Sequence, residues 1–151
     1  MKDHHTSTST NNKPAQLRLI AILMGITFMR AFMGTMIPSL EMYGGENPNA
    51  WFGPWVSDTF LGLLAPLMIF LLLTKRGIKT WGSLLVYNGI GAFDYAHGLI
   101  TQWTDPLTPN GIFGTPELTY GSLSFSLVVQ LAVIMLLFSP NVIDYFNNKK
   151  G

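Results

Sequence analysis

Four long apolar segments, separated by connections whose charge alternates in sign, constrain this chain more than any other feature. The segments run over about Leu17–Ile37, Trp55–Thr74, Thr80–Trp103 and Thr119–Phe138. Each has close to the ~20 residues that a helix needs to cross a ~30 Å hydrocarbon core. A soluble bundle would show polar stripes at helical spacing, and the run from 63 to 73 shows none. The sequence therefore predicts an all-α membrane protein with four transmembrane helices in an up-down-up-down bundle.

The charges of the connections predict how this bundle is oriented. Basic residues precede the first span, fill the gap between the second and third, and follow the fourth, whereas the other two connections carry only acids. The basic residues are Lys2, Lys13, Arg18, Lys75, Arg76, Lys79, Lys149 and Lys150, and the acids are Glu41, Glu46, Asp105 and Glu117. Because cytoplasmic loops are rich in Lys and Arg, we expect both termini in the cytoplasm and the protein in the inner (plasma) membrane of a bacterium.

Composition narrows the classes of partner and of site that the chain can have. Charged residues make up 11% of the 151 residues and apolar residues 48%, so the lipid bilayer is the expected partner. The net charge of +1 argues against a nucleic-acid partner. The absence of cysteine excludes disulfides and thiolate metal sites. The predicted organisation is a disordered polar tail over 1–16, a transmembrane domain over 17–147 and a basic tail over 148–151, with extended outer turns at Pro38–Pro54 and Thr104–Glu117.

Three charges, Arg30, Asp58 and Asp94, lie within the spans. A charge there costs roughly 2.5–3.5 kcal/mol on insertion scales and usually marks a function or a buried pair. Asp58 precedes Arg76 of the inner hairpin by 18 residues and Asp94 follows it by 18. At about 1.5 Å per residue both carboxylates lie roughly 25 Å from the inner end, and Arg30 at a similar height. The three charges are therefore predicted to meet in one layer of the outer half of the membrane.

Two acids and one base leave this layer with a surplus negative charge. That surplus requires a bound proton, a bound cation, access to water or a shifted pKa. One interpretation is a structural clamp, in which the guanidinium forks between carboxylates and fixes the register of the helices. The other is a binding site for a proton, a cation or a polar ligand. The sequence leaves both open.

Three further polar residues are candidates for the same site. Asn88 shares a face of the third span with Asp94. His97 follows Asp94 by three residues and could be a proton relay, a ligand of haem or chlorophyll, or an interfacial histidine without a ligand. Gln130 lies on a polar face of the fourth span, suited to hydrogen bonds between helices or to a ligand. We predict no metal ion and no cofactor.

The acids of the second and third spans sit in similar surroundings. Asp58–Leu63 and Asp94–Leu99 both read Asp-x-x-x-Gly-Leu. Asp and Gly four residues apart share a helical face, where the glycine lets another backbone or a ligand approach.

Two stretches resemble a group of small bacterial four-helix membrane proteins of unknown function. Pro54–Pro66 carries Asp-x-x-x-Gly followed by Ala-Pro, and the run 88–94 reads Asn-x-x-Gly-x-x-Asp. The similarity covers roughly residues 50–138. The chain departs from the group at 55–57, where Trp-Val-Ser replaces a glycine-rich approach, and at His97, which has no counterpart. The resemblance implies the four-helix fold and no particular activity.

The chain shows no motif for catalysis. No serine lies beside a recognisable base, no pair of histidines has metal-ligand spacing, and no glycine-rich phosphate loop occurs. We expect a non-enzymatic membrane protein whose polar layer binds a small ligand or ion or supports assembly of a larger membrane complex. The alternative is a small oligomeric ion- or proton-coupled transporter or channel. A membrane-embedded enzyme and a haem- or pigment-binding subunit rank behind both. Expected partners are further copies of the chain or other subunits of a membrane complex.

Overall fold

A computed structural model describes residues 13–109 and 114–147, and the regular structure of these residues is helical. The first column of the fold consists of α1 (Ala15–Thr27), η1 (Phe28–Phe32), α2 (Met33–Met36), η2 (Ile37–Ser39) and α3 (Leu40–Tyr43). The elements η1 and η2 are 3-10 helices, so this column tightens from α-helical to 3-10 geometry at two places. The predicted tails over 1–16 and 148–151 lie outside the described residues, except for 13–16.

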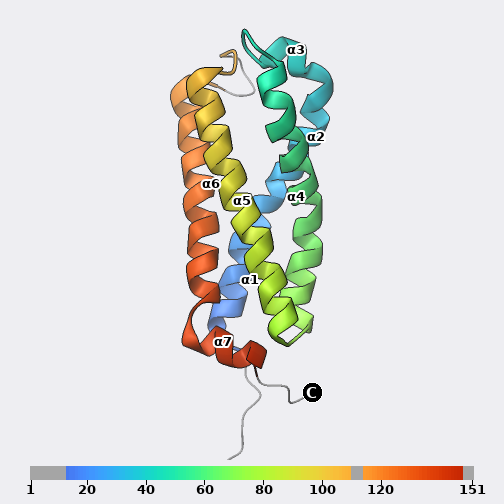
Figure 1. The fold of residues 1–151 in the computed structure, drawn as a ribbon, viewed down its shortest axis with the longest axis vertical. Coiled ribbons are helices and arrows are strands. Elements are labelled where there is room, and N and C mark those ends of the chain that lie inside the picture. Colours follow the sequence, from blue (N-terminus) through green and yellow to red (C-terminus); the bar gives the residue numbers. More distant parts are fainter. Residues whose placement is uncertain (1–12, 110–113, 148–151) are drawn as a thin grey trace, which may run out of the picture.

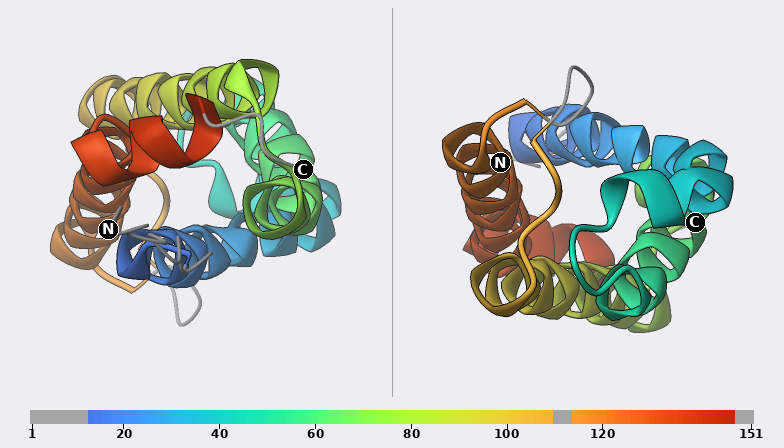
Figure 2. Two further views of the ribbon diagram at one scale, coloured as in Figure 1. Left: turned by 90° about the horizontal axis from the view of Figure 1, so that it is seen from below. Right: turned by 90° about the horizontal axis from the view of Figure 1, so that it is seen from above.

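Three long uninterrupted helices complete the main body: α4 (Asn49–Thr74), α5 (Ile78–Thr104) and α6 (Pro116–Leu137). The first column packs against α4 and α6, and α5 packs against the same two helices on the opposite side. Figures 1 and 2 show these columns standing side by side around a common interior. Residues 44–48 join the first column to α4 and residues 75–77 join α4 to α5, and across each of these short connections the chain reverses its direction.

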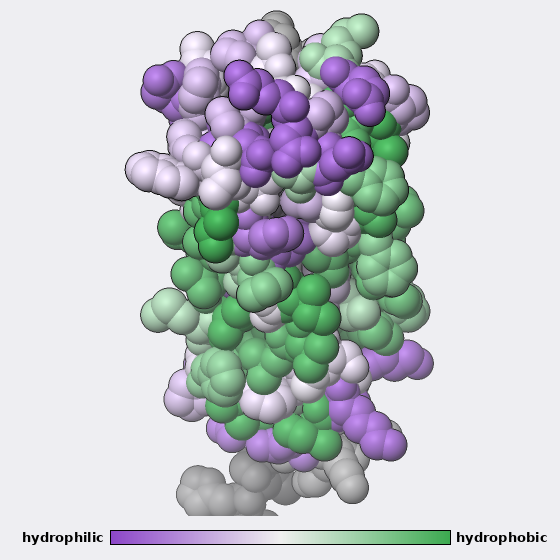
Figure 3. All heavy atoms as spheres, turned by 45° about the horizontal axis from the view of Figure 1, so that its top comes forward, coloured by the Kyte–Doolittle hydropathy of each residue, from purple (hydrophilic) through white to green (hydrophobic). Residues whose placement is uncertain are grey.

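Three of these segments are long and apolar enough to cross a membrane: Ala15–Tyr43, Asn49–Thr74 and Pro116–Leu137. This agrees with a multi-pass membrane protein. The remaining column, α5, has 27 residues but a less apolar sequence, because one of its faces carries polar side chains. Figure 3 shows a band of hydrophobic residues between hydrophilic ends on the visible face.

The outer connection before α4 is shorter than the sequence predicts. Residues 37–43 are helical rather than extended, and α4 begins at Asn49 instead of Trp55. The Gly-Pro pair at 53–54 favours a loop locally, but the helix continues through it. Tertiary packing explains the difference: Trp51 and Trp55 are buried in an outer apolar cluster with Leu40 and Leu107.

A short helix that was not predicted from the sequence, α7 (Pro140–Asn147), lies across the end of the molecule opposite to the outer cluster (Figure 1). Its buried side chains, Val142, Tyr145 and Phe146, join the main apolar core. The guanidinium carbon of Arg76 lies 4.6 Å from the centroid of the Tyr145 ring. This helix therefore covers the end that carries the α4–α5 hairpin.

Candidate functional site

The structure brings Arg30, Asp58 and Asp94 into one cluster. Arg30 Nε donates to Asp58 Oδ1 at 2.5 Å, and Arg30 Nη2 donates to Asp94 Oδ2. Arg30 is only 4% exposed, and the side chains of Asp58 and Asp94 are 15% and 10% exposed. A single guanidinium thus links the first column to both α4 and α5 through charge-assisted hydrogen bonds.

The two acids lie at one level because of the helical hairpin. Asp58 precedes the end of α4 at Thr74 by 16 residues, and Asp94 follows the start of α5 at Ile78 by 16. Helical rise is constant, so equal spacing from the hairpin gives equal height. The spacing found in the sequence therefore describes the real geometry of the cluster.

Arg30 is carried by a 3-10 turn pressed against α4. A Cβ atom at Gly62 would lie 2.2 Å from the backbone nitrogen of Ala31, the neighbour of Arg30. Only glycine permits so close an approach of the two backbones. A 3-10 stretch in the middle of a long helix often marks a functional or strained region, and here it coincides with the charged residue.

Two residues of the cluster were not among the sequence-based candidates. Ser57 Oγ lies within hydrogen-bond distance of Asp94 Oδ1 and, at 3.0 Å, of the Pro54 carbonyl. The Arg30 Cζ lies 4.1 Å from the centroid of the buried Tyr95 ring, a cation–π contact. The sequence indicated these two residues only by their positions next to Asp58 and Asp94. Adjacent residues on a helix point about 100° apart, so adjacency alone does not predict that they belong to the site.

Asn88 and Gln130 provide polar atoms beside the charges. Both side chains are fully buried. Asn88 Nδ2 donates to the Leu84 carbonyl at 2.7 Å. Within the described residues, Asn88 Oδ1, both amide atoms of Gln130, and Arg30 Nη1 have no hydrogen-bond partner. Such buried groups in proteins generally pair with water or a ligand, because each unpaired one costs about 1–3 kcal/mol.

Gly91 is where two of these groups meet. A Cβ atom at this position would lie 2.2 Å from Gln130 Nε2 and 3.0 Å from Arg30 Nη1. The missing side chain therefore leaves room for the amide of α6 and the guanidinium of the first column to approach α5. Asn88 lies one turn away on the same buried face. The arrangement offers both donors and acceptors to a small polar guest.

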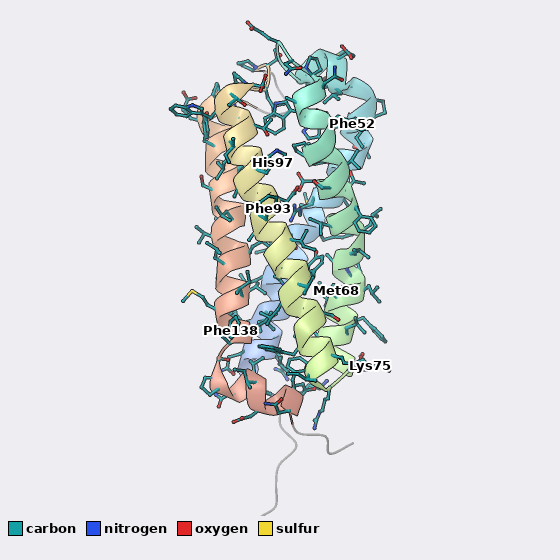
Figure 4. The ribbon with its side chains drawn as sticks, in the orientation of Figure 1. Phe52, Met68, Lys75, Phe93, His97 and Phe138 are labelled. Atoms are coloured by element: carbon teal, nitrogen blue, oxygen red, sulfur yellow. The ribbon has the colours of Figure 1, made fainter. Side chains whose placement is uncertain are left out.

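His97 does not join the cluster. It is exposed on α5, three residues beyond the buried Asp94 (Figure 4). The two glycines of the Asp-x-x-x-Gly pattern differ in their packing. A Cβ atom at Gly62 would clash with backbone atoms of Ala31, whereas a Cβ atom at Gly98 would lie 3.4 Å from the Leu123 side chain, which is an ordinary contact. The likeness of the two segments thus does not extend to their packing.

Among the described residues, no group of three or more His, Cys, Asp and Glu side chains gathers in a way that could hold a metal ion. The cluster itself presents carboxylate oxygens, a serine hydroxyl and side-chain amides. Oxygen atoms of this kind accept a proton, coordinate hard cations, or accept hydrogen bonds from an ammonium group.

Comparisons of the chain with protein-family models, with curated protein sequences and with solved structures found no match. The resemblance to small four-helix membrane proteins rests on its motifs alone, and the site is interpreted from its own geometry.

Proposed function

We propose that the chain is a multi-pass inner-membrane protein with four crossing helices, whose outer-half polar layer binds a small cation or a proton. The observation that carries this proposal is the convergence of two buried carboxylates on one buried guanidinium. With all three groups ionised the cluster has a net charge of −1. Within residues 13–109 and 114–147 no second cationic side chain forms an ion pair with either acid. A bound proton or cation would balance this charge, which is costly to leave uncompensated away from water.

The distribution of side chains on α5 supports the fourth crossing. Its interior face carries Asn88, Asp94, Thr101 and Gln102, all buried. Its outward face carries large apolar side chains that are more than half exposed: Val86, Ile90, Phe93, Ile100 and Trp103. A helix at a water-exposed surface has the reverse arrangement. Polar groups inside and apolar groups outside are what a bilayer requires.

The charges at the two ends of the molecule support an orientation with both termini in the cytoplasm. Lys13 Nζ donates to the carbonyl of Leu73 at 2.8 Å, so the start of the first column lies beside the end of α4. The basic hairpin 75–79 is at that same end. The acids Glu41, Glu46 and Asp105 belong to the opposite connections. Because cytoplasmic loops are rich in Lys and Arg, this distribution of charge favours a cytoplasmic hairpin end.

Apolar layers on both sides of the cluster favour binding over conduction through a single chain. Towards the hairpin end, the main core fills the interior with fully buried residues such as Ile20, Leu72 and Val133. Towards the other end, Trp55 and its neighbours form the outer cluster. The outer connections are also tied together, since the indole nitrogen of Trp51 donates to the Asp105 carbonyl at 2.6 Å. A guest of the polar layer is thus enclosed from both ends.

Binding is expected to raise the melting temperature of the purified protein. Sodium, ammonium and methylammonium chloride are titrated at constant ionic strength against choline chloride, and the same scan is run against pH. A guest that binds only the folded state stabilises it by about 2.7 kcal/mol at 100 times its Kd. The response should be lost in Asp58→Asn and Asp94→Asn and kept in Glu46→Gln, which removes an exposed acid. A wild-type response identical to that of both Asp→Asn variants would refute the proposal.

The orientation is tested by labelling single cysteines, for which the natural chain provides a cysteine-free background. Glu46→Cys, in the exposed connection before α4, should react with a membrane-impermeant thiol reagent added to intact cells. Lys75→Cys, in the exposed hairpin, should react only after the cells are opened. Labelling of Lys75→Cys from outside would reverse the orientation and move the polar layer to the inner half of the membrane.

A further inference from the structure

An apolar groove runs along the outside of the molecule between α4 and α5. It has a volume of about 590 Å³, a size typical of small-molecule sites. Its lining comes from both helices: Ser57, Phe60, Leu61, Leu64 and Met68 of α4, and Gly82, Ser83, Val86, Tyr87 and Ile90 of α5. In Figure 4, Met68 marks its α4 wall in the half near the hairpin. Met68 follows Ser57 by eleven positions, so the groove is about 17 Å long at helical rise.

The groove opens sideways, towards the surface that faces lipid in the proposed topology. Phe60 and Val86 line it and are each 62% exposed. A Cβ atom added at Gly82 would have no other atom within 4 Å, so the end of the groove near the hairpin is open. A groove of this kind is filled from the bilayer rather than from water, because its walls are apolar and its mouth lies in the hydrophobic band.

The other end of the groove reaches the charged cluster. Ser57 is part of the lining, and its hydroxyl is hydrogen-bonded to Asp94. The next residue, Asp58, bonds to Arg30 from the adjacent side of α4. The walls of the groove are therefore mainly apolar, with a serine hydroxyl at each end: Ser83 bonds to the backbone carbonyl of Lys79, whereas Ser57 bonds to a cluster with surplus negative charge.

We propose that the groove binds a single-chain amphiphile from the bilayer, with a protonated amine at Ser57 and Asp94 and its apolar chain between α4 and α5. This rests on the proposed function, since the ammonium group is the cation that the polar layer accepts. Charge complementarity determines which head group of the amphiphile is favoured. A cationic head offsets the surplus negative charge, a neutral alcohol does not, and a carboxylate adds to it. A charge-assisted hydrogen bond is about twice as strong as a neutral one.

The test uses the protein in phosphatidylcholine nanodiscs and dodecylamine with a diazirine in its chain. Irradiation should attach the probe to residues of the groove, and excess dodecylamine should suppress this labelling at least about tenfold more effectively than dodecanol or dodecanoate at equal membrane content. Val86→Trp, which fills the groove from an exposed position, should abolish labelling. Ile100→Trp, equally exposed on the same helix and outside the lining, should not.

Each other outcome decides against the proposal. Equal competition by dodecylamine, dodecanol and dodecanoate would mean that the groove binds lipid chains without preference for a head group. Cross-links between two copies would make it a contact between protomers. Ser57→Ala, a mild change at the meeting point, should reduce the preference for the amine without removing chain labelling, and an unchanged preference would contradict the placement of the head. If the amphiphile fails while methylammonium still shifts the melting temperature through Asp58 and Asp94, the proposed function stands and the groove assignment falls.

Discussion

Arg30→Leu is expected to destabilise the protein by about 3–5 kcal/mol, the usual cost of removing one partner from a buried charge pair. The variant leaves Asp58 and Asp94 in a nearly dry interior without their shared cation. Adding Asp94→Asn should recover part of the loss, and adding Asp58→Asn as well should recover more. The measurement is the free energy of unfolding in mixed detergent micelles, followed by helical circular dichroism.

The order of these variants is the informative result. If the double variant is no more stable than Arg30→Leu, the guanidinium and the Asp94 carboxylate do not interact. Arg30→Lys is the matched control for charge. A lysine keeps the positive charge but cannot present a planar fork to two carboxylates from different helices, so it should recover only part of the stability of the wild type.

The level of the site was predictable from the sequence, and the reason is geometric. A tight hairpin fixes two helices as antiparallel neighbours, and constant rise then converts equal spacing from the hairpin into equal height. This places Asp58 and Asp94 at the same height without knowledge of any contact. The height of Arg30 follows in the same way from its distance to the start of its own span.

Rotation about the helix axis was harder to predict than height. Gly91 lies at the centre of the buried face of α5. At about 100° per residue, Asp94 is displaced from Gly91 by roughly 60° and His97 by roughly 120° in the same direction. Asp94 therefore remains inside while His97 turns out to the surface. The sequence shows that the two residues are close, but only packing determines which of them faces the interior.

Departures from ideal helix were also invisible in the sequence. The 3-10 turn at Phe28–Phe32 contains neither proline nor glycine, the usual signs of a break. It arises where the first column is held against Gly62. Likewise, α4 extends past Pro54 to Asn49 because Trp51 and Trp55, on either side of this proline, are both buried in the outer apolar cluster. In both cases tertiary contacts override local preference.

Gly62→Ala is expected to have a large effect for so small a change, because the new Cβ would lie 2.2 Å from the Ala31 backbone nitrogen. Backbone atoms cannot rotate away as a side chain can, so η1 must shift. We expect a loss of about 1–3 kcal/mol from overpacking, and a weaker cation response because Arg30 moves with the turn. Gly53→Ala is the control on the same helix, since no atom lies within 4 Å of its Cβ position, and it should be neutral or stabilising.

A second variant separates a backbone clash from a side-chain clash at the same place. The Ala31 Cβ lies 2.9 Å from the modified position, farther than the Ala31 nitrogen and Cα. Adding Ala31→Gly to Gly62→Ala removes the methyl group but leaves the backbone in the way, so stability should stay low. Full recovery would mean that only the methyl group opposes the new Cβ. If Gly62→Ala instead unfolds with the same free energy as Gly53→Ala, the first column and α4 are not in backbone contact, and the position of Arg30 must have another cause.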